Sequence, residues 1–415
     1  MTTFLSGMEV HTAPAGTAAT VVDGPAMRIP ASLAPSAGAP GAPDNQHDPD
    51  NPTNPARWRG PRFCDIHSTM RAVVIDEYGG PEKVSVQDLP DPHPGPGEVV
   101  VRVAAAALNR LDIWALSGSL GFPIEFPHIL GADAAGEIDG VGEGVTGLRR
   151  GAKVMVNPGL SCGACELCRA GEQSECPNFK LLGEHVPGTF AEKIKVPFQN
   201  VFPFPSHLSW AEAASLGITF TTAYRMLYAQ GRFRPGEWAL ITGIGGGLAL
   251  SLLQLARPVA GKIFVTSSSP DKLTRAGDLG ADEGIDYTAE DVGKAVRRLT
   301  GKRGVDAVFD SAGGPSLDAN LRCLRPGGRV VIAGVTGGPK VEIDLRRIFW
   351  SQLSVIGATM GSHRDVSDML RAVAGGKLRP KVDRTFPFER ASEAFLHLES
   401  QDRFGKVVLE FATGG

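Results

Sequence analysis

The sequence lacks any run of the roughly 18 to 20 apolar residues that a membrane-spanning helix needs, because Gly, Pro or a charged residue breaks each candidate run. Its net charge of -3 offers no positive field for nucleic acid or an anionic membrane. The N-terminus shows no basic segment followed by a compact apolar core and a small-residue cleavage site. We therefore expect a cytoplasmic protein whose partner is a small-molecule substrate, with no nucleic-acid and no membrane partner.

Cysteine is also scarce, at six residues in 415, yet four of them lie close together: Cys162, Cys165, Cys168 and Cys176. In a reducing compartment, such a group is more plausibly a metal site than a set of disulfides. Four thiolates around one tetrahedral ion leave no open position, which is typical of structural zinc. Disulfides and an iron–sulfur cluster remain alternatives, the latter because Pro177 follows the last cysteine. Cys64 and Cys323 are expected to be structural or inert.

The chain is longer than one hydrophobic core usually organises, so we expect more than one domain. Residues 1–69 are rich in Ala, Pro, Gly, Thr and Asp, without apolar periodicity, and are predicted to be disordered. From Met70, alternating strands separated by Pro- and Gly-rich turns indicate an antiparallel, β-rich domain. Beyond Ser209, apolar strands alternate with helices, which predicts a parallel, doubly wound α/β sheet. The final strand, 406–411, is free to return to the first domain.

A glycine-rich segment joins the predicted strand 238–242 to the predicted helix 248–256 and contains Gly243, Gly246 and Gly247. Small residues let the backbone approach a pyrophosphate, and the helix N-terminus offers free N–H groups. A packing turn would also tolerate glycine, but the flanking strand and helix favour a dinucleotide site.

The residue after the second strand helps to determine which nicotinamide cofactor binds. An NAD-preferring site usually places an acid there, whereas this chain has Ser267 and Ser268, with Lys272 one helical turn further on. Hydroxyl and ammonium groups can donate to a 2′-phosphate, which favours NADP(H). Asp271 competes for a ribose contact but follows Pro270, so it is better interpreted as a helix-start residue.

From Met70 to Phe411 the chain resembles the medium-chain dehydrogenase/reductase family, which includes zinc alcohol dehydrogenases and quinone reductases. The resemblance rests on the cysteine cluster, the glycine loop and four further segments: Asn109–Asp112, Pro127–Gly136, Gly188–Glu192 and Gly405–Val408. It implies a GroES-like catalytic domain formed by 70–218 and 359–415 and a Rossmann domain formed by 219–358. It also implies a homodimer or homotetramer that pairs through the sheet edge at Leu353–Ala358.

The zinc alcohol dehydrogenases of this family hold a second, catalytic zinc, and the resemblance allows its ligand positions to be compared. They fall on Asn109, Ala132 and Ile218, none of which polarises an alkoxide as Lewis-acid zinc does. Asn109 and Asp112 instead resemble the quinone and enone reductases. Those relatives place a lysine and a tyrosine around the 2′-phosphate, and Lys272 and Tyr287 have the same spacing.

The sequence thus predicts an NADPH-dependent reductase of quinones or α,β-unsaturated carbonyl compounds, with one structural zinc and no catalytic zinc. Hydride transfer then needs mainly positioning and donors to the carbonyl oxygen. Thr222, or else Thr221, is expected beside the nicotinamide, and Asn109 is a candidate donor to the carbonyl; a loop-stabilising amide fits it equally well.

Asp112 and His185 are candidates for proton handling, against structural roles for both, and Trp114 is expected in the cleft or the core. The alternatives are an alcohol or aldehyde dehydrogenase of the zinc-containing type and a nucleotide-binding protein without catalysis.

Overall fold

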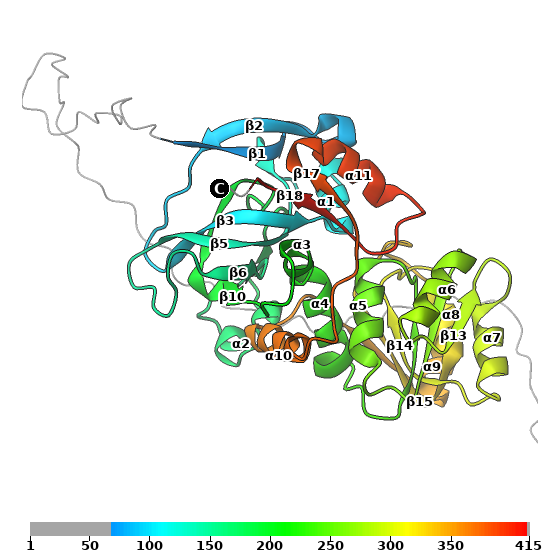
Figure 1. Ribbon diagram of the computed structural model, residues 1–415. Coiled ribbons are helices and arrows are strands. Elements are labelled where there is room, and N and C mark those ends of the chain that lie inside the picture. Colours follow the sequence, from blue (N-terminus) through cyan, green and yellow to red (C-terminus); the bar gives the residue numbers. More distant parts are fainter. Residues whose placement is uncertain (1–67, 413–415) are drawn as a thin grey trace, which may run out of the picture. The chain divides into compact units, whose positions relative to one another are not determined.

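The computed structural model describes residues 68–412 (Figure 1). Most of the predicted disordered extension, 1–67, lies outside the described residues, and so does Cys64. Strand β1, the first described strand, begins at Thr69, one residue before Met70. Within the described part, no helix is both long enough and apolar enough to cross a membrane.

The β-rich part contains a three-stranded and a seven-stranded sheet. The first has the order β2-β1-β4 and consists of β1 (Thr69–Ile75), β2 (Ser85–Pro90) and β4 (His128–Ile129). The second has the order β10-β6-β5-β3-β18-β17, with β9 also on β3. Its strands are β3 (Glu98–Ala107), β5 (Asp133–Val141), β6 (Lys153–Val156), β9 (Lys193–Pro197), β10 (Val201–Pro203), β17 (Val382–Pro387) and β18 (Lys406–Glu410).

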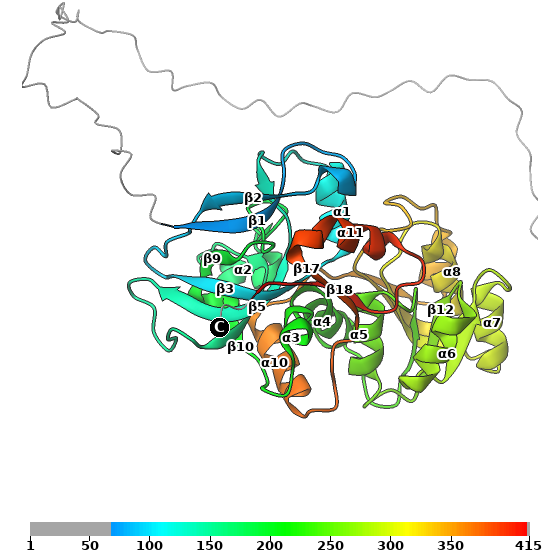
Figure 2. The same cartoon turned by 45° about the horizontal axis from the view of Figure 1, so that its top comes forward.

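A third large sheet has six strands, all parallel, as the doubly wound pattern predicted. Figure 2 labels one of its strands, β12, among the helices that cover the sheet. Its order is β13-β12-β11-β14-β15-β16, so the chain starts in the middle and moves out to one edge and then to the other. The strands are β11 (Trp238–Ile241), β12 (Lys262–Ser267), β13 (Glu283–Asp286), β14 (Val305–Asp310), β15 (Leu324–Ile332) and β16 (Ser354–Gly357). All six residues of β14 are buried, as expected for a strand with helices over both faces.

The helices follow the same division. The β-rich part carries α1 (Arg110–Ser117), α2 (Glu166–Arg169), α3 (Trp210–Ala214) and α11 (Ala391–Glu399), and the 3-10 turns η1 (Pro81–Lys83), η2 (Gln173–Glu175), η3 (Phe198–Asn200) and η5 (Phe388–Arg390). A short hairpin of β7 (Gly159–Leu160) and β8 (Lys180–Leu181) flanks α2. Helix α4 precedes the parallel sheet in the chain, α10 follows it, and five helices lie between its strands. Their bounds are α4 (Gly217–Tyr224), α5 (Gly247–Ala256), α6 (Pro270–Asp278), α7 (Val292–Leu299), α8 (Ser316–Cys323), α9 (Leu345–Trp350) and α10 (His363–Ala374).

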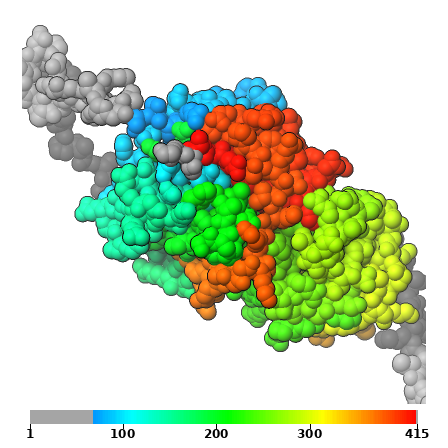
Figure 3. All heavy atoms as spheres, in the orientation of Figure 1, coloured from blue at the N-terminus to red at the C-terminus, as the bar shows by residue number. Residues whose placement is uncertain are grey.

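The C-terminal strand does return to the first domain. β18 pairs antiparallel with β3, and the backbone N–H of Gly405, just before β18, donates to the carbonyl of Gly245 in the glycine loop. Figure 3 shows the orange and red C-terminal residues beside both the blue N-terminal strands and the green residues near 200–260. One short segment therefore touches the β-rich part and the glycine loop at the same time.

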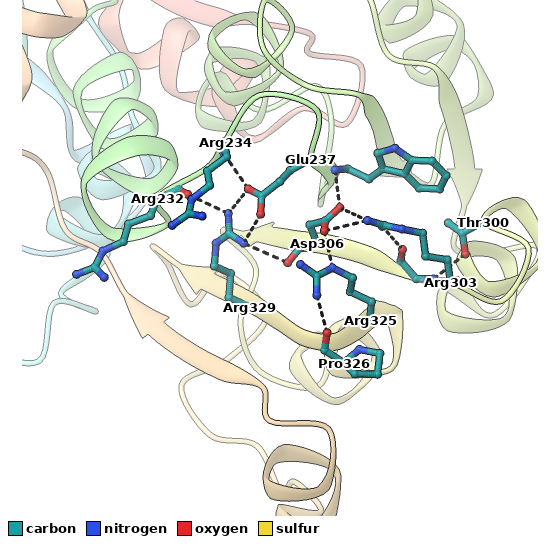
Figure 4. Close-up of polar contacts among 11 residues, drawn as sticks. Arg232, Arg234, Glu237, Thr300, Arg303, Asp306, Arg325, Pro326 and Arg329 are labelled. Carbon is teal, nitrogen blue, oxygen red and sulfur yellow. Dashed lines mark hydrogen bonds and ion pairs between the residues drawn. The ribbon is translucent and has the colours of Figure 1, made fainter.

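The amino ends of three parallel strands are joined by charged side chains (Figure 4). Asp306 on β14 accepts from the Trp238 N–H at 2.8 Å and from Arg303 and Arg325, while Arg329 on β15 pairs with Glu237. Burial alone would raise the pKa of Asp306, but these donors outweigh it and hold that pKa below its ordinary value. This network fixes the sheet at the end away from the glycine loop.

Candidate active site

A cavity of about 830 Å³ is lined by side chains from both the β-rich part and the parallel sheet. Many of the residues predicted from the sequence meet there: Asn109, Trp114, Ile218, Thr222, Gly243, Gly246, Gly247, Ser267, Ser268, Lys272 and Tyr287. Asp112, Thr221 and His185 do not line it. A volume of this size, with a few polar groups among apolar walls, suits a cofactor together with a small substrate.

The glycine loop enters this cavity between β11 and α5. Gly243 and Gly245 have φ angles of 66° and 112°, and Gly246 caps α5. A Cβ at Gly247 would lie 2.8 Å from the Lys406 side chain and 3.1 Å from Thr219, so a larger residue would not fit without movement. The free N–H groups of the first turn of α5 make this end suitable for a phosphate.

The end of β12 presents hydroxyl and ammonium groups to the same cavity. Ser267 is buried and its hydroxyl accepts from the Ser269 N–H, while Ser268 and the half-exposed Tyr287 line the cavity. Lys272 donates to the carbonyl of Gln401. Ser269 is the N-cap of α6, and Asp271 lies in the first helical turn, as its interpretation as a helix-start residue predicted.

Asn109, Asp133 and Lys406 form a buried hydrogen-bonded group, of which Asn109 and Lys406 line the cavity. The Asn109 amide nitrogen donates to the Ala107 carbonyl at 3.2 Å and to Asp133 Oδ2 at 2.9 Å, so both its hydrogens have acceptors within the protein. The Lys406 ammonium donates to Asn109 Oδ1 at 2.5 Å and to Asp133 Oδ2 at 3.1 Å. The other Asp133 oxygen accepts from the Ile218 N–H at 2.7 Å.

Asp112 lies behind this group. Its Oδ2 accepts from the Asn109 N–H at 2.6 Å and so forms the capping box of α1. The side chain is fully buried, and this burial raises the pKa of Asp112 to about 7. Asp112 therefore positions Asn109 and does not face the cavity.

Helix α4 delivers Thr222 to the cavity, and Thr221 lies buried outside the lining. Directly after α4 the chain forms a π-helix, η4 (Arg225–Gln230), a local irregularity that often accompanies functional sites. Its first residue, Arg225, is buried and binds Asp365 at 2.8 Å, Glu172 at 2.8 Å and Glu175 at 2.6 Å. Arg225 thus ties the helix of Thr222 to the cysteine-rich segment.

The four clustered cysteines converge as their spacing predicted. Their sulfur atoms all lie within 4.8 Å of one another, with separations of 3.5 to 3.9 Å for three of the pairs, and none forms a disulfide. A tetrahedral ion with sulfur ligands at about 2.3 Å sets sulfur–sulfur separations of about 3.8 Å. Backbone N–H groups point at the sulfurs, and those of Ala164 and Cys165 lower the pKa of Cys162 to about 6. The cluster therefore fits one tetrahedral metal ion.

His185 lies outside the cavity wall and stacks on Phe122. Its Nδ1 accepts from the Leu181 N–H at 3.2 Å, so the ring proton is on Nε2, and burial lowers the pKa of His185. The neighbouring Glu184 is also buried, which raises its pKa to about 7. His185 therefore lies in a loop and does not line the cavity.

Comparison with known proteins places this geometry in a family. Residues 95–206 match the alcohol dehydrogenase GroES-like domain, and residues 247–375 match the zinc-binding dehydrogenase domain. An acryloyl-coenzyme A reductase of Metallosphaera sedula is 31% identical over 342 residues, covering 82% of this chain and 99% of that protein. The chain belongs to the medium-chain dehydrogenase/reductase family.

Solved structures agree with this assignment. A crystal structure of an NAD-dependent alcohol dehydrogenase is 44% identical, with a TM-score of 0.80 over 83% of this chain and all of that one. A crotonyl-CoA carboxylase/reductase in complex with NADP has a TM-score of 0.78 at 28% identity, over 82% of this chain and 95% of that one. The GroES-like and Rossmann architecture is therefore confirmed, and the chain is an NAD(P)H-dependent oxidoreductase.

The sequence interpretation missed four cationic residues of the cavity: Arg110, Arg225, Arg403 and Lys406. Lys406 belongs to the terminal Gly405–Val408 segment, which was recognised as a family motif but was given no role. Its position at the start of a strand that returns to β3 was the available signal, since the start of such a strand lies near the boundary between the two domains.

Proposed function

We propose that this chain is an NADPH-dependent oxidoreductase that transfers a hydride to an α,β-unsaturated carbonyl compound or a quinone. In this proposal it holds one structural zinc ion and uses no catalytic zinc. The observation that carries the proposal is the buried group of Asn109, Asp133 and Lys406 at the substrate end of the cavity. Hydrogen bonds join these three side chains to one another at Asn109, which the family resemblance aligns with a ligand of the catalytic zinc, and this supports a site without that ion.

The cofactor preference rests on the other end of the cavity. Ser267, Ser268, Lys272 and Tyr287 gather at the end of β12, where a 2′-phosphate would accept from hydroxyl and ammonium groups. Among residues 68–412, the only carboxylate that lines the cavity is Glu175, which is paired with Arg225. This arrangement favours NADP(H) over NAD(H), and the glycine residues 243, 246 and 247 would face the diphosphate.

When bound, the cofactor supplies the hydride, and the residues of the chain orient the reactants. Thr222 would contact the nicotinamide side of the cavity, where its hydroxyl lies 3.8 Å from the Met360 sulfur. Asn109 and Asp112 would act as positioning residues, because their hydrogen bonds fix Asp133 and Lys406. Trp114 would close the apolar wall and exclude water, which strengthens electrostatic interactions inside the site.

The metal proposal rests on the cysteine geometry. Four sulfur ligands close the coordination sphere of a tetrahedral ion. Zinc held by Cys162, Cys165, Cys168 and Cys176 would therefore stabilise the cysteine-rich segment without contacting substrate. Because the ligands must be thiolates, the same set favours the reducing cytoplasm as the compartment.

A second candidate function is an alcohol or aldehyde dehydrogenase of the zinc-containing type, because the solved structure that is 44% identical is named as an NAD-dependent alcohol dehydrogenase. Metal analysis and turnover separate the two. We expect one zinc per chain and NADPH oxidation, followed by absorbance, with enones, quinones or enoyl thioesters. Two zinc ions per chain with alcohol oxidation would instead establish the second candidate.

We also propose that the chain forms a homodimer, or a tetramer of such dimers, through the edge strand β16 and helix α9. Among the described residues, β16 pairs only with β15. Beside it, Leu345, Phe349, Trp350 and Val355 are exposed, Trp350 to 83%. Apolar side chains next to a strand whose outer edge has no partner among the described residues suit a second copy of the same edge.

The molar mass of the protein, measured by light scattering as it elutes from a size-exclusion column, tests this interface. Phe349→Glu with Trp350→Glu should give monomers at concentrations where the wild type is dimeric, while Leu396→Glu, at another exposed apolar residue, should leave the dimer intact. An unchanged mass for the first variant would rule out this edge as the interface.

A further inference from the structure

The ammonium of Lys406 lies beside Asn109, one of the three positions that the family resemblance assigns to ligands of a catalytic zinc. Its Nζ is 2.5 Å from Oδ1 of Asn109, the first of those positions. It also binds Asp133, whose second oxygen accepts from the N–H of Ile218, the third position. The positive charge at this place in the cavity is therefore the ammonium of a side chain, where the zinc alcohol dehydrogenases of the family hold a metal ion.

The donors in this group can be counted. Both amide hydrogens of Asn109 are used, by Ala107 and Asp133, so Asn109 has no further donor to offer a substrate. An ammonium carries three N–H groups. Within the described residues, Lys406 gives two of them to Asn109 and Asp133. Lys406 lines the cavity whereas Asp133 does not, and no described residue accepts the third N–H.

The surroundings hold this charge in place. The side chains of Lys406 and Asp133 are 5% and 0% exposed, so water screens their interaction poorly. Burial lowers the pKa of Lys406, and the contact with Asp133 opposes that shift. Arg403 and Asp112 are the other charged groups near it. A donor fixed in a site of low dielectric needs no reorganisation when charge develops beside it.

We propose that Lys406 is the catalytic electrophile of this enzyme: its third N–H donates to the carbonyl oxygen of the substrate and stabilises the enolate formed during reduction. This inference rests on the proposed function. The hydride from NADPH forms the new bond at the β-carbon, and NADPH is oxidised to NADP⁺. The C=C electron pair moves so that negative charge collects on the carbonyl oxygen, water later protonates the α-carbon, and Lys406 keeps its proton throughout.

A competing role for Lys406 follows from its second neighbour. Its side chain also lies against Gly247 at the start of α5, so the ammonium could serve the cofactor diphosphate instead. The two roles differ in what they affect. A donor to the enolate changes the hydride step at saturating cofactor, whereas a diphosphate ligand changes the affinity for NADPH.

Kinetics of the zinc-loaded enzyme distinguish these roles. Lys406→Met alone leaves a buried carboxylate at Asp133 without its cation, so the main variant is Lys406→Met with Asp133→Asn, which removes both charges and keeps an acceptor for the Ile218 N–H. Asp133→Asn alone is the matched control. At saturating NADPH, we expect the single-turnover hydride step of the double variant to be slower than that of the control by about 10²- to 10³-fold, the usual effect of losing one such donor. The dissociation constant of NADPH should change less than about threefold, which is below 0.7 kcal/mol. An unchanged hydride step with weakened NADPH binding would overturn the proposal.

A second readout does not require turnover. A nitrophenol bound with NADP⁺ imitates the enolate oxygen, and its absorbance reports whether it is bound as the phenolate. We expect wild type and Asp133→Asn to bind the phenolate at a pH where the free phenol is neutral, and the double variant to bind only the neutral phenol. If the wild type reduces none of the enones or quinones but still binds the phenolate, the role of Lys406 is supported and the proposed substrate class is refuted. If the double variant binds phenolate as well as wild type does, Lys406 is not the electrophile.

Discussion

Replacing Arg225 by methionine tests whether the cysteine-rich segment is coupled to the helix that carries Thr222. The Arg225 side chain is 2% exposed and binds three carboxylates, of which Asp365 is 9% exposed. Glu172 and Glu175 are each 44% exposed. Methionine fills a similar volume but leaves Asp365 without a cation.

The expected cost follows from these exposures. Removing one partner of a buried ion pair destabilises a protein by about 3 to 5 kcal/mol, whereas an exposed pair contributes at most about 1 kcal/mol. Asp365 keeps two donors, the N–H and the hydroxyl of Ser362 at 2.8 and 3.1 Å, which favours the lower end of the range. We therefore expect Arg225→Met to cost about 3 kcal/mol, and Glu172→Gln or Glu175→Gln at most about 1 kcal/mol each.

Urea-induced unfolding of the zinc-loaded protein, followed by tryptophan fluorescence, measures these differences. Arg371→Met is the matched control, because Arg371 also pairs with an aspartate but is 77% exposed, and we expect a change within about 0.5 kcal/mol. A cost for Arg225→Met no larger than that of the control would show that the three ion pairs do not stabilise this junction. A cost for Glu172→Gln equal to that of Arg225→Met would show that burial is not the deciding factor.

Three further predictions concern other parts of the molecule. Burial raises the pKa of Asp112 from an ordinary value of 3.8 to about 7, so its contribution to stability is present below pH 3.8 and is lost as the pH rises to about 7; Asp112→Asn, which keeps an acceptor for the Asn109 N–H, should flatten the dependence of unfolding free energy on pH across that range. Lys272→Ala should raise KM for NADPH by about tenfold, the effect of one lost charge-assisted hydrogen bond, and leave KM for NADH unchanged; equal effects on both cofactors would contradict a 2′-phosphate contact. Cys176→Ser should abolish the stoichiometric zinc measured by elemental analysis and lower the thermal unfolding midpoint; retained zinc would contradict the four-thiolate site.

The features that the sequence predicted correctly depend on local pattern. The parallel sheet follows from buried runs such as 305–310, which alternate with helices. The cysteine cluster follows from a spacing of a few residues, since a short segment can fold back on itself around one centre. The glycine loop needed only a strand before it and a helix after it.

The features that the sequence did not reveal depend on partners far apart in the chain. Lys406 and Asn109 are separated by 297 positions, and Arg225 meets carboxylates 50, 53 and 140 positions away. No periodicity encodes such pairs, because each side chain has an ordinary local environment. Asn109 is an example: its residue type fitted a donor to substrate and a loop-stabilising amide equally well, and only the fold shows that both of its amide hydrogens have acceptors within the protein.

The C-terminal segment explains why the two ends of the cavity cannot be treated as independent. Gly405 donates to the glycine loop, Lys406 reaches Asn109 and Asp133, and the strand that follows pairs with β3. The φ of 137° at Gly405, and the 2.5 Å that would separate a Cβ there from the Lys381 carbonyl, restrict this position to glycine. A displacement of the backbone at Gly405 would therefore move the ammonium and the glycine loop together. One strand therefore positions both the glycine loop and the Lys406 ammonium. A substitution at Gly405 would affect cofactor binding as well as hydride transfer, whereas substitution of Lys406 tests hydride transfer alone.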